Sequence, residues 1–135
     1  MKQINVYLTF DGNCREAMTF YAEALGGELS LMKFKDMPQC PAGASDRIMH
    51  ARLSKGGAVL MASDTMPGTQ FQPGNNFSIS VDAESASEVD TLVRALSADG
   101  TITMPAQDMF WGAYFGMLTD KFGLQWMFNF DKPKA

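Results

Sequence analysis

The chain has 135 residues, enough for one hydrophobic core, and 46% of them are hydrophobic, including 10 Phe and 11 Met. This composition excludes a disordered chain, and a net charge of −4 excludes a basic surface for nucleic acid or for an anionic membrane. No stretch approaches the roughly 18 apolar residues of a membrane span, and the chain opens directly on a predicted strand. We therefore expect a cytoplasmic protein with no nucleic acid and no membrane as partner.

The first predicted elements are a half-buried strand and an amphipathic helix. Apolar and polar residues alternate over 4–10, and apolar residues then recur at helical spacing over 14–25. Asn13 and Glu16 have the spacing of a capping box, and Gly26-Gly27 ends the helix.

A strand over about 28–34 follows, and then a loop rich in Pro and Gly over 36–46. Residues 47–53 and 57–63 predict a hairpin with Lys55 and Gly56 in its turn. A polar linker over about 64–75 precedes the second half of the chain.

The second half repeats this order. We predict a strand over 76–82, a helix that begins at a capping box formed by Ser85 and Glu88, a strand over 101–104, and a final hairpin over 114–119 and 124–130. The sequence itself shows the repeat, because Asn5 at the start of the first strand is matched by Asn76 at the start of the corresponding strand in the second half. The sequence thus predicts an α+β fold of two tandem βαβββ modules, with module one over 1–66, a linker over 67–74 and module two over 75–135.

Strand alternation assigns side chains to two sheet faces. Residues predicted to pack under the two helices are Ile4, Val6, Leu8, Phe10, Phe77, Ile79, Val81, Trp126, Phe128 and Phe130. The other face carries Tyr7, Gln125 and Met127, together with His50, Arg52 and Met61 from the predicted hairpin. That face is too polar for a closed core and too rich in Met and aromatic residues for a purely solvated surface.

Cys14 and Cys40 have neither CxxC nor Cys/His spacing. Cys14 lies on the apolar side of the first helix, where a buried free thiol is the usual state, and Cys40 lies in the loop. We expect no structural disulfide.

The chain resembles the vicinal oxygen chelate superfamily of glyoxalases, bleomycin-resistance proteins and extradiol dioxygenases. It is most similar to the PhnB-like branch, which is also described as 3-demethylubiquinone methyltransferase-like. The resembling segments are Tyr7 to Gly12, Phe20-Tyr21 with Leu25 to Gly27, Ile48 to Ala51, Leu60 to Asp64, and Phe110 to Gly112 through Phe122 to Trp126. The resemblance implies mixed sheets curled around one cleft, and a homodimer.

In metal-dependent members of this superfamily, the ligands lie on the first and last strands of each module. The corresponding residues are Asn5, Met61, Asn76 and Met127. Amide oxygens and thioethers are poor ligands for a divalent ion. We therefore expect no metal and no cofactor, although a site based on His50 with an acid from elsewhere stays open.

The candidate ligand-binding residues are Tyr7, Arg52, Met61, Phe110, Trp111, Tyr114, Phe115, Gln125 and Met127. Arg52 suits a carboxylate or phosphate, or else a salt bridge within the protein. The aromatic residues suit a lid over a flat ligand, or else a hydrophobic plug or a dimer seam. His50 is the candidate catalytic residue, because a neutral imidazole can act as a general base; the alternative is a residue that orients a ligand.

These patterns predict a protein that binds or modifies a small, partly aromatic or amphipathic molecule in the cleft between the modules, without the usual metal. Two alternatives stay open. One is a metal-dependent lyase, isomerase or dioxygenase, and the other is a dimeric interaction protein without catalysis.

Overall fold

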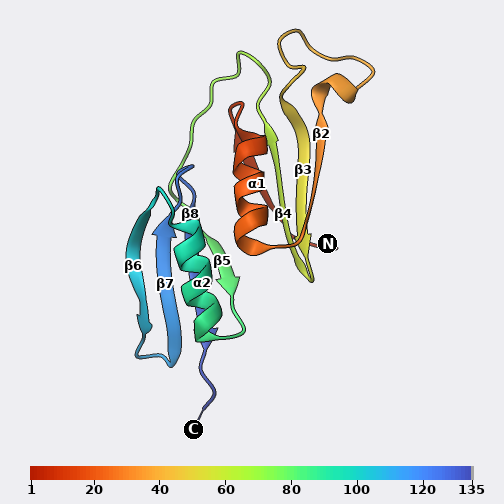
Figure 1. Cartoon of the computed structure of the whole chain (residues 1–135). Coiled ribbons are helices and arrows are strands. Elements are labelled where there is room, and N and C mark those ends of the chain that lie inside the picture. The colour runs from red at the N-terminus through yellow and green to blue at the C-terminus, as the bar shows by residue number, and fades with distance from the viewer. Residues whose placement is uncertain (135) are drawn as a thin grey trace. The chain divides into compact units, whose positions relative to one another are not determined.

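The computed structural model describes residues 1–134, which form two compact units divided between Gln72 and Pro73. Each unit has one α-helix against a four-stranded mixed sheet, and the elements follow each other in the order βαβββ (Figure 1). The predicted α+β fold of two tandem modules is therefore confirmed. We call residues 1–72 unit 1 and the residues from Pro73 onward unit 2.

In unit 1 the sheet order is β1-β4-β3-β2, with β1 parallel to β4 and the other pairs antiparallel. Its elements are β1 (Val6–Phe10), α1 (Cys14–Leu25), β2 (Glu28–Lys33), the 3-10 turn η1 (Phe34–Asp36), β3 (Ile48–Lys55) and β4 (Ala58–Asp64). The long loop between η1 and β3 is the largest departure of unit 1 from the plain repeat.

Unit 2 has the same topology, with the order β5-β8-β7-β6 and the parallel pair again joining the first and last strands. Its elements are β5 (Ile79–Asp82), α2 (Ala86–Leu96), β6 (Thr101–Asp108), β7 (Ala113–Thr119) and β8 (Gln125–Asp131). β6 is four residues longer than the strand predicted over 101–104.

Each helix covers one face of its own sheet, and the core lies between them. The buried residues of unit 1 include Leu8, Phe10, Met18, Tyr21, Ala51, Leu53, Leu60 and Ala62. Those of unit 2 include Ile79, Val89, Leu92, Leu96, Leu118, Trp126 and Phe128. The rings of Trp126 and Phe128 stack at a centroid distance of 6.1 Å. The predicted assignment of faces is thus confirmed for the central strands.

The prediction was wrong at the start of the first strand of each unit. Ile4 and Phe77 were expected under the helices, but they precede β1 and β5 and are 84% and 47% exposed, and Val6 is 36% exposed. In unit 2 the reason is visible: the side-chain amide of Gln125 donates to the carbonyl oxygens of Asn75 (2.8 Å) and Phe77 (2.7 Å). This side chain replaces the strand pairing that would extend β5.

The β3–β4 turn lies one residue later than predicted. Lys55 pairs with Ala58, so Gly56 and Gly57 form the turn, and Gly56 has a φ of 57°. Arg52 pairs with Met61 rather than with Val59. Because the pairing shifts by two residues in total, every side chain stays on its predicted face.

The two helices begin in different ways. The Ser85 side chain accepts a hydrogen bond from the backbone N–H of Glu88 (3.0 Å), as predicted, and Glu88 accepts in turn from the N–H of Glu84 (3.1 Å). The capping box predicted for α1 is wrong, because Asn13 makes no side-chain cap. Asp64 at the end of β4 instead accepts from the N–H groups of Gly12 (2.8 Å) and Cys14 (3.0 Å).

A glycine lies at the same place in both units, between the helix and the next strand. A Cβ atom at Gly27 would lie 2.4 Å from the carbonyl oxygen of Ser54, and one at Gly100 would lie 2.4 Å from that of Thr119. Both contacts are with backbone atoms, which cannot rotate away. These glycines therefore allow a close approach of two chain segments.

Within residues 1–134, no helix is both long and apolar enough to cross a membrane. Both cysteines are free, as predicted, with Cys14 buried and Cys40 exposed.

Burial, and secondarily the charge of Asp64, raises the pKa of the Cys14 thiol to about 12. Because the thiolate is the reactive form, we expect Cys14 to resist thiol reagents in the folded protein. Titration with Ellman's reagent at pH 8 should modify one thiol, Cys40, in the native protein and both thiols in denaturant. Cys40→Ser should then abolish the rapid reaction, whereas fast modification of two thiols in the native protein would contradict the burial of Cys14.

Candidate functional site

The sheet face of unit 1 that lies opposite α1 carries the predicted site residues of that unit. The strand register places Ser30, Arg52, Met61 and Tyr7 in one row across the sheet. We call this surface the open face of unit 1; its residues are Tyr7, Thr9, Ser30, Met32, His50, Arg52, Met61 and Ser63. Tyr7 and Met32 are 48% and 47% exposed, so large apolar groups lie uncovered beside polar ones.

Tyr7 and His50 form the polar contact of this face. The Tyr7 hydroxyl oxygen lies 3.1 Å from Nδ1 of His50, and the two ring centroids are 5.7 Å apart. β4 lies between their two strands, so the tyrosine side chain reaches across it. The only histidine of the sequence therefore has one ring nitrogen engaged and the other, Nε2, without a described hydrogen bond within residues 1–134.

Arg52 is exposed on the same face, two residues from His50 along β3. Among residues 1–134 no ion pair or hydrogen bond engages its guanidinium, so the internal salt bridge considered from the sequence is not formed there. Arg47 differs, because it bonds Asp11 and Thr65. Arg52 is therefore a cation available to an anion from outside the chain.

The predicted aromatic residues of unit 2 divide between two faces. Trp111 contacts Phe115 and Phe110 edge to face, at centroid distances of 5.7 and 5.2 Å, and Phe110 is 96% exposed. The Tyr114 hydroxyl instead donates to Asp90 of α2 at 2.6 Å, and this bond raises the pKa of Tyr114. Of the four predicted aromatic residues, Phe110, Trp111 and Phe115 therefore form a cluster. Tyr114 lies on the side of α2.

Two further predicted residues lie on the face of unit 2 opposite α2. Met127 pairs with Ser80 on one side and Met117 on the other, and its side chain is partly exposed. The side-chain amide of Gln125 is engaged by the carbonyls of Asn75 and Phe77. Ligand contact by either residue stays a prediction. The Gln125 amide also has a structural role, which no local sequence pattern indicates.

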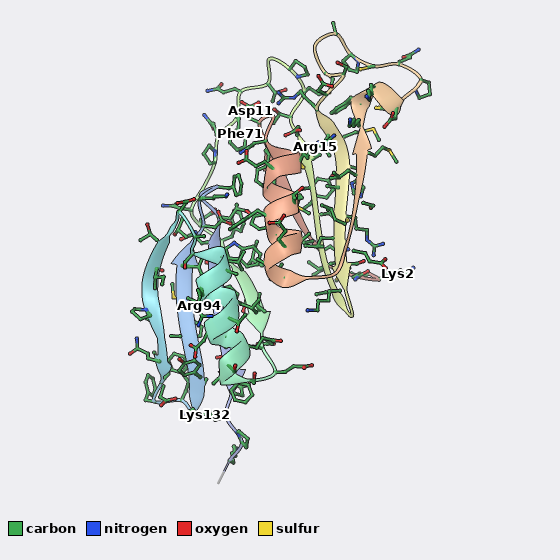
Figure 2. The ribbon with its side chains drawn as sticks, viewed as in Figure 1. Lys2, Asp11, Arg15, Phe71, Arg94 and Lys132 are labelled. Carbon is green, nitrogen blue, oxygen red and sulfur yellow. The ribbon has the colours of Figure 1, made fainter. Side chains whose placement is uncertain are left out.

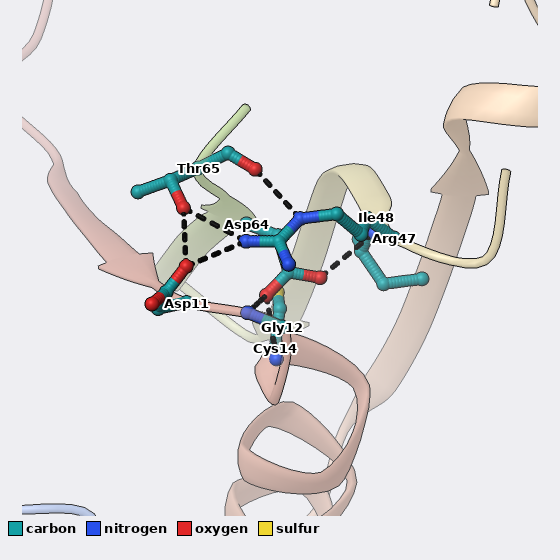
Figure 3. Close-up of polar contacts among 7 residues, drawn as sticks. All are labelled: Asp11, Gly12, Cys14, Arg47, Ile48, Asp64 and Thr65. Carbon is teal, nitrogen blue, oxygen red and sulfur yellow. Dashed lines mark hydrogen bonds and ion pairs between the residues drawn. The ribbon is translucent and has the colours of Figure 1, made fainter. Parts of the chain in front are cut away.

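A buried polar cluster, which no sequence pattern indicates, surrounds Asp64 (Figure 3). The Asp64 carboxylate is 5% exposed and accepts from the N–H groups of Gly12, Cys14 and Ile48, the last at 2.8 Å. It thereby joins β4 to the start of α1 and the start of β3. The bonds from Gly12 and Cys14 join residues about fifty positions apart in the sequence. No local pattern can therefore predict them.

Next to this cluster, Arg47 donates from Nη2 to Asp11 and from Nε to the carbonyl oxygen of Thr65, both at 2.8 Å (Figure 3). The Thr65 hydroxyl donates to Asp11 at 2.8 Å. Bonds from Thr65 and then from Arg47 lower the pKa of Asp11. Because all three residues are engaged with one another, we assign them a structural role.

In unit 2 the segment Asp-x-Phe-Gly-x-x-Trp, which carried part of the sequence resemblance, has a structural explanation. The Asp120 carboxylate accepts from the backbone N–H groups of Phe122 (2.8 Å) and Leu124 (3.1 Å) and from the indole N–H of Trp126 (2.8 Å). Gly123 supplies a φ of 88° within this turn. The motif therefore fixes the β7–β8 turn to the core.

A family model described as 3-demethylubiquinone-9 3-methyltransferase matches residues 2–128. This match covers most of the sequence. The chain belongs to this family. Protein YjdN from Escherichia coli (strain K12) is 35% identical to the chain over 97% of each sequence.

Solved structures agree with this assignment. Protein PA1353 from Pseudomonas aeruginosa is 44% identical, with a TM-score of 0.90 over 98% of this chain and 100% of that one. A protein from Bacillus cereus described as a putative 3-demethylubiquinone-9 3-methyltransferase, PhnB protein, is 28% identical, with a TM-score of 0.78 over 96% and 99% of the two chains.

The fold extends beyond the 3-demethylubiquinone-9 3-methyltransferase family. A glyoxalase/bleomycin resistance protein/dioxygenase family enzyme from Burkholderia phytofirmans has a TM-score of 0.62 at 18% identity and covers 96% of each chain. At that identity the likeness concerns the fold alone. The predicted PhnB-like family and the glyoxalase/bleomycin-resistance fold are both confirmed.

The side chains of this family member do not fit the metal site implied by the fold. Within residues 1–134, no group of three or more His, Cys, Asp or Glu residues is placed to hold an ion. The partners of Met61 and Met127 on the adjoining first strands are Tyr7 and Ser80, and Asn5 and Asn76 precede those strands. Thioethers and neutral hydroxyls are weak ligands for a hard or borderline cation, so we derive no chemistry from a metal here.

Proposed function

We propose that this protein binds a small, partly aromatic or amphipathic molecule against the open face of unit 1. The observation that carries the proposal is the uncovered mixture on that face: exposed Tyr7 and Met32 lie beside His50 and an unpaired Arg52. Ligand sites combine apolar surface with a few polar groups that fix the orientation of the ligand. Methionine suits such a surface because its flexible thioether adapts to different shapes.

The face of unit 2 with Trp111, Phe115, Met117 and Met127 is a second surface of similar composition. That the two faces line one cleft stays a prediction from the sequence. The family description names a methyltransferase, so S-adenosylmethionine belongs among the compounds tested. The proposed binding function itself requires no turnover.

A thermal-shift screen of aromatic and amphipathic compounds tests the proposal. A ligand at about 100 times its Kd should raise the free energy of unfolding by about 2.7 kcal/mol, which is a readily measured shift. Met61→Glu should abolish that shift, because Met61 pairs directly with Arg52 and the new carboxylate would occupy the guanidinium. Met66→Glu is the matched control, since Met66 is exposed and lies beyond β4.

Two outcomes would contradict the proposal. One is binding that Met61→Glu leaves unchanged. The other is a screen without any hit, together with a dimer whose molar mass, measured by light scattering, falls on Phe110→Ser. The second result would favour the dimeric interaction protein, for which the exposed Phe110 and Trp111 would supply the contact.

A further inference from the structure

The contact between Tyr7 and His50 determines what the open face offers to a ligand. A neutral imidazole has one N–H donor and one acceptor nitrogen, and the partner of one nitrogen fixes the state of the other. A phenol carries an acidic O–H group and is a good donor to an imidazole nitrogen. The Tyr7 oxygen lies 3.1 Å from Nδ1. On this chemical ground we assign the Tyr7 O–H as the donor, which places the hydrogen of a neutral His50 on Nε2.

This state gives the open face two neighbouring donors. His50 and Arg52 lie two residues apart on β3 with their side chains on one face, which corresponds to about 7 Å between their Cα atoms. Arg52 offers a planar guanidinium suited to a carboxylate, and His50 offers a single N–H. Glu28 is the acidic residue nearest in register, and within residues 1–134 it forms no ion pair with Arg52.

Resting on the proposed binding function, we infer that the ligand is an organic acid with an aromatic or alkyl body and with a hydroxyl or carbonyl oxygen a few bonds from its acidic group. Arg52 binds the acidic group, and the Nε2–H group of His50 donates to the second oxygen. Tyr7 is a positioning residue, which holds the imidazole in the donor state. The apolar body of the ligand lies against Met61 and Met32, which pair with Arg52 and His50.

Three matched probes separate these contributions: 3-phenyllactate has both groups, 3-phenylpropionate lacks the hydroxyl, and 3-phenyllactamide lacks the charge. Isothermal titration of the full chain should rank them in that order of affinity, with about a tenfold loss for the missing hydroxyl and about a hundredfold loss for the missing charge, because a hydrogen bond to a charged group contributes more than a neutral one. Arg52→Gln should remove the preference for the acids over the amide. Arg94→Gln on the exposed surface of α2 is the matched control and should change nothing (Figure 2).

The histidine and the tyrosine have their own readouts. His50→Phe should reduce 3-phenyllactate to the affinity of 3-phenylpropionate without changing the latter. Tyr7→Phe should act in the same direction but more weakly. Nitrogen-15 spectra, in which the one histidine needs no assignment, should then show a smaller fraction of the Nε2–H form in Tyr7→Phe than in the unchanged protein.

Equal binding of the amide and the acids, or Arg52→Gln without effect, would overturn this inference. Failure of all three probes to bind at millimolar concentration would also overturn it. The proposed function would survive that failure if neutral aromatic compounds bound in the thermal-shift screen and Met61→Glu abolished their binding. The two ideas are therefore separable.

Discussion

Asp64→Asn should lower the free energy of unfolding by about 3 to 5 kcal/mol, because the carboxylate accepts three backbone N–H groups away from water. An asparagine retains one carbonyl oxygen, which can still serve Gly12 and Cys14 from the position of Oδ1. Its NH₂ group then faces the N–H of Ile48, so that two donors oppose each other. Urea unfolding followed by far-UV circular dichroism measures the loss.

Asp11→Asn is the matched control, since it makes the same change at an aspartate in the neighbouring group of Arg47 and Thr65. The Asp11 side chain is 51% exposed, and its ion pair with Arg47 is therefore screened by water. We expect a loss below about 1 kcal/mol. Equal losses for the two variants would contradict the structural role of burial at Asp64.

Gly100→Ala should cost about 3 kcal/mol, because the new Cβ atom would lie 2.4 Å from the carbonyl oxygen of Thr119 and 3.0 Å from backbone atoms of Asp120. Its φ is outside the left-handed region, so the cost arises from the close contact alone. The turn between α2 and β6 must move to relieve it. Urea unfolding of unit 2 measures this cost.

Gly57→Ala is the control for Gly100→Ala. A Cβ atom at Gly57 meets nothing within 4 Å, and the residue also has no left-handed φ. The alanine should leave stability unchanged or raise it by a few tenths of a kcal/mol, because it restricts the unfolded chain. If Gly100→Ala lowered the free energy of unfolding no more than Gly57→Ala, the turn between α2 and β6 would have moved without cost, and the prediction would be wrong.

Alternation and helical spacing were enough to predict the elements and the faces of the central strands. Leu53, Leu60 and Trp126 are buried and Arg52 and Met61 lie opposite them, because a strand with one buried face fixes parity strongly. Strand ends were not predictable. β5 begins only at Ile79 because the side chain of Gln125 binds the carbonyl oxygens that precede it, and no alternating pattern shows that competition.

For the candidate site too, the sheet face of each residue could be predicted, but its contacts could not. The sequence placed His50 and Arg52 on one face with Tyr7, but not the bond between Tyr7 and His50, which depends on a side chain crossing β4. Trp111 lies in the β6–β7 loop and Tyr114 lies just after it, at the start of β7, and this closeness in the sequence predicts a single aromatic group. Strand alternation and an acidic residue on α2 turn Tyr114 to the opposite side.

The positions of the two tryptophans have a practical consequence for all these measurements. Trp111 is half exposed and Trp126 is 1% exposed, and both belong to unit 2, whereas unit 1 has none. Indole emission therefore reports directly on unit 2 alone, from the solvent-exposed Trp111 and the buried Trp126. A comparison of emission with circular dichroism, which sees both helices, would reveal whether the two units unfold as one cooperative body or in sequence.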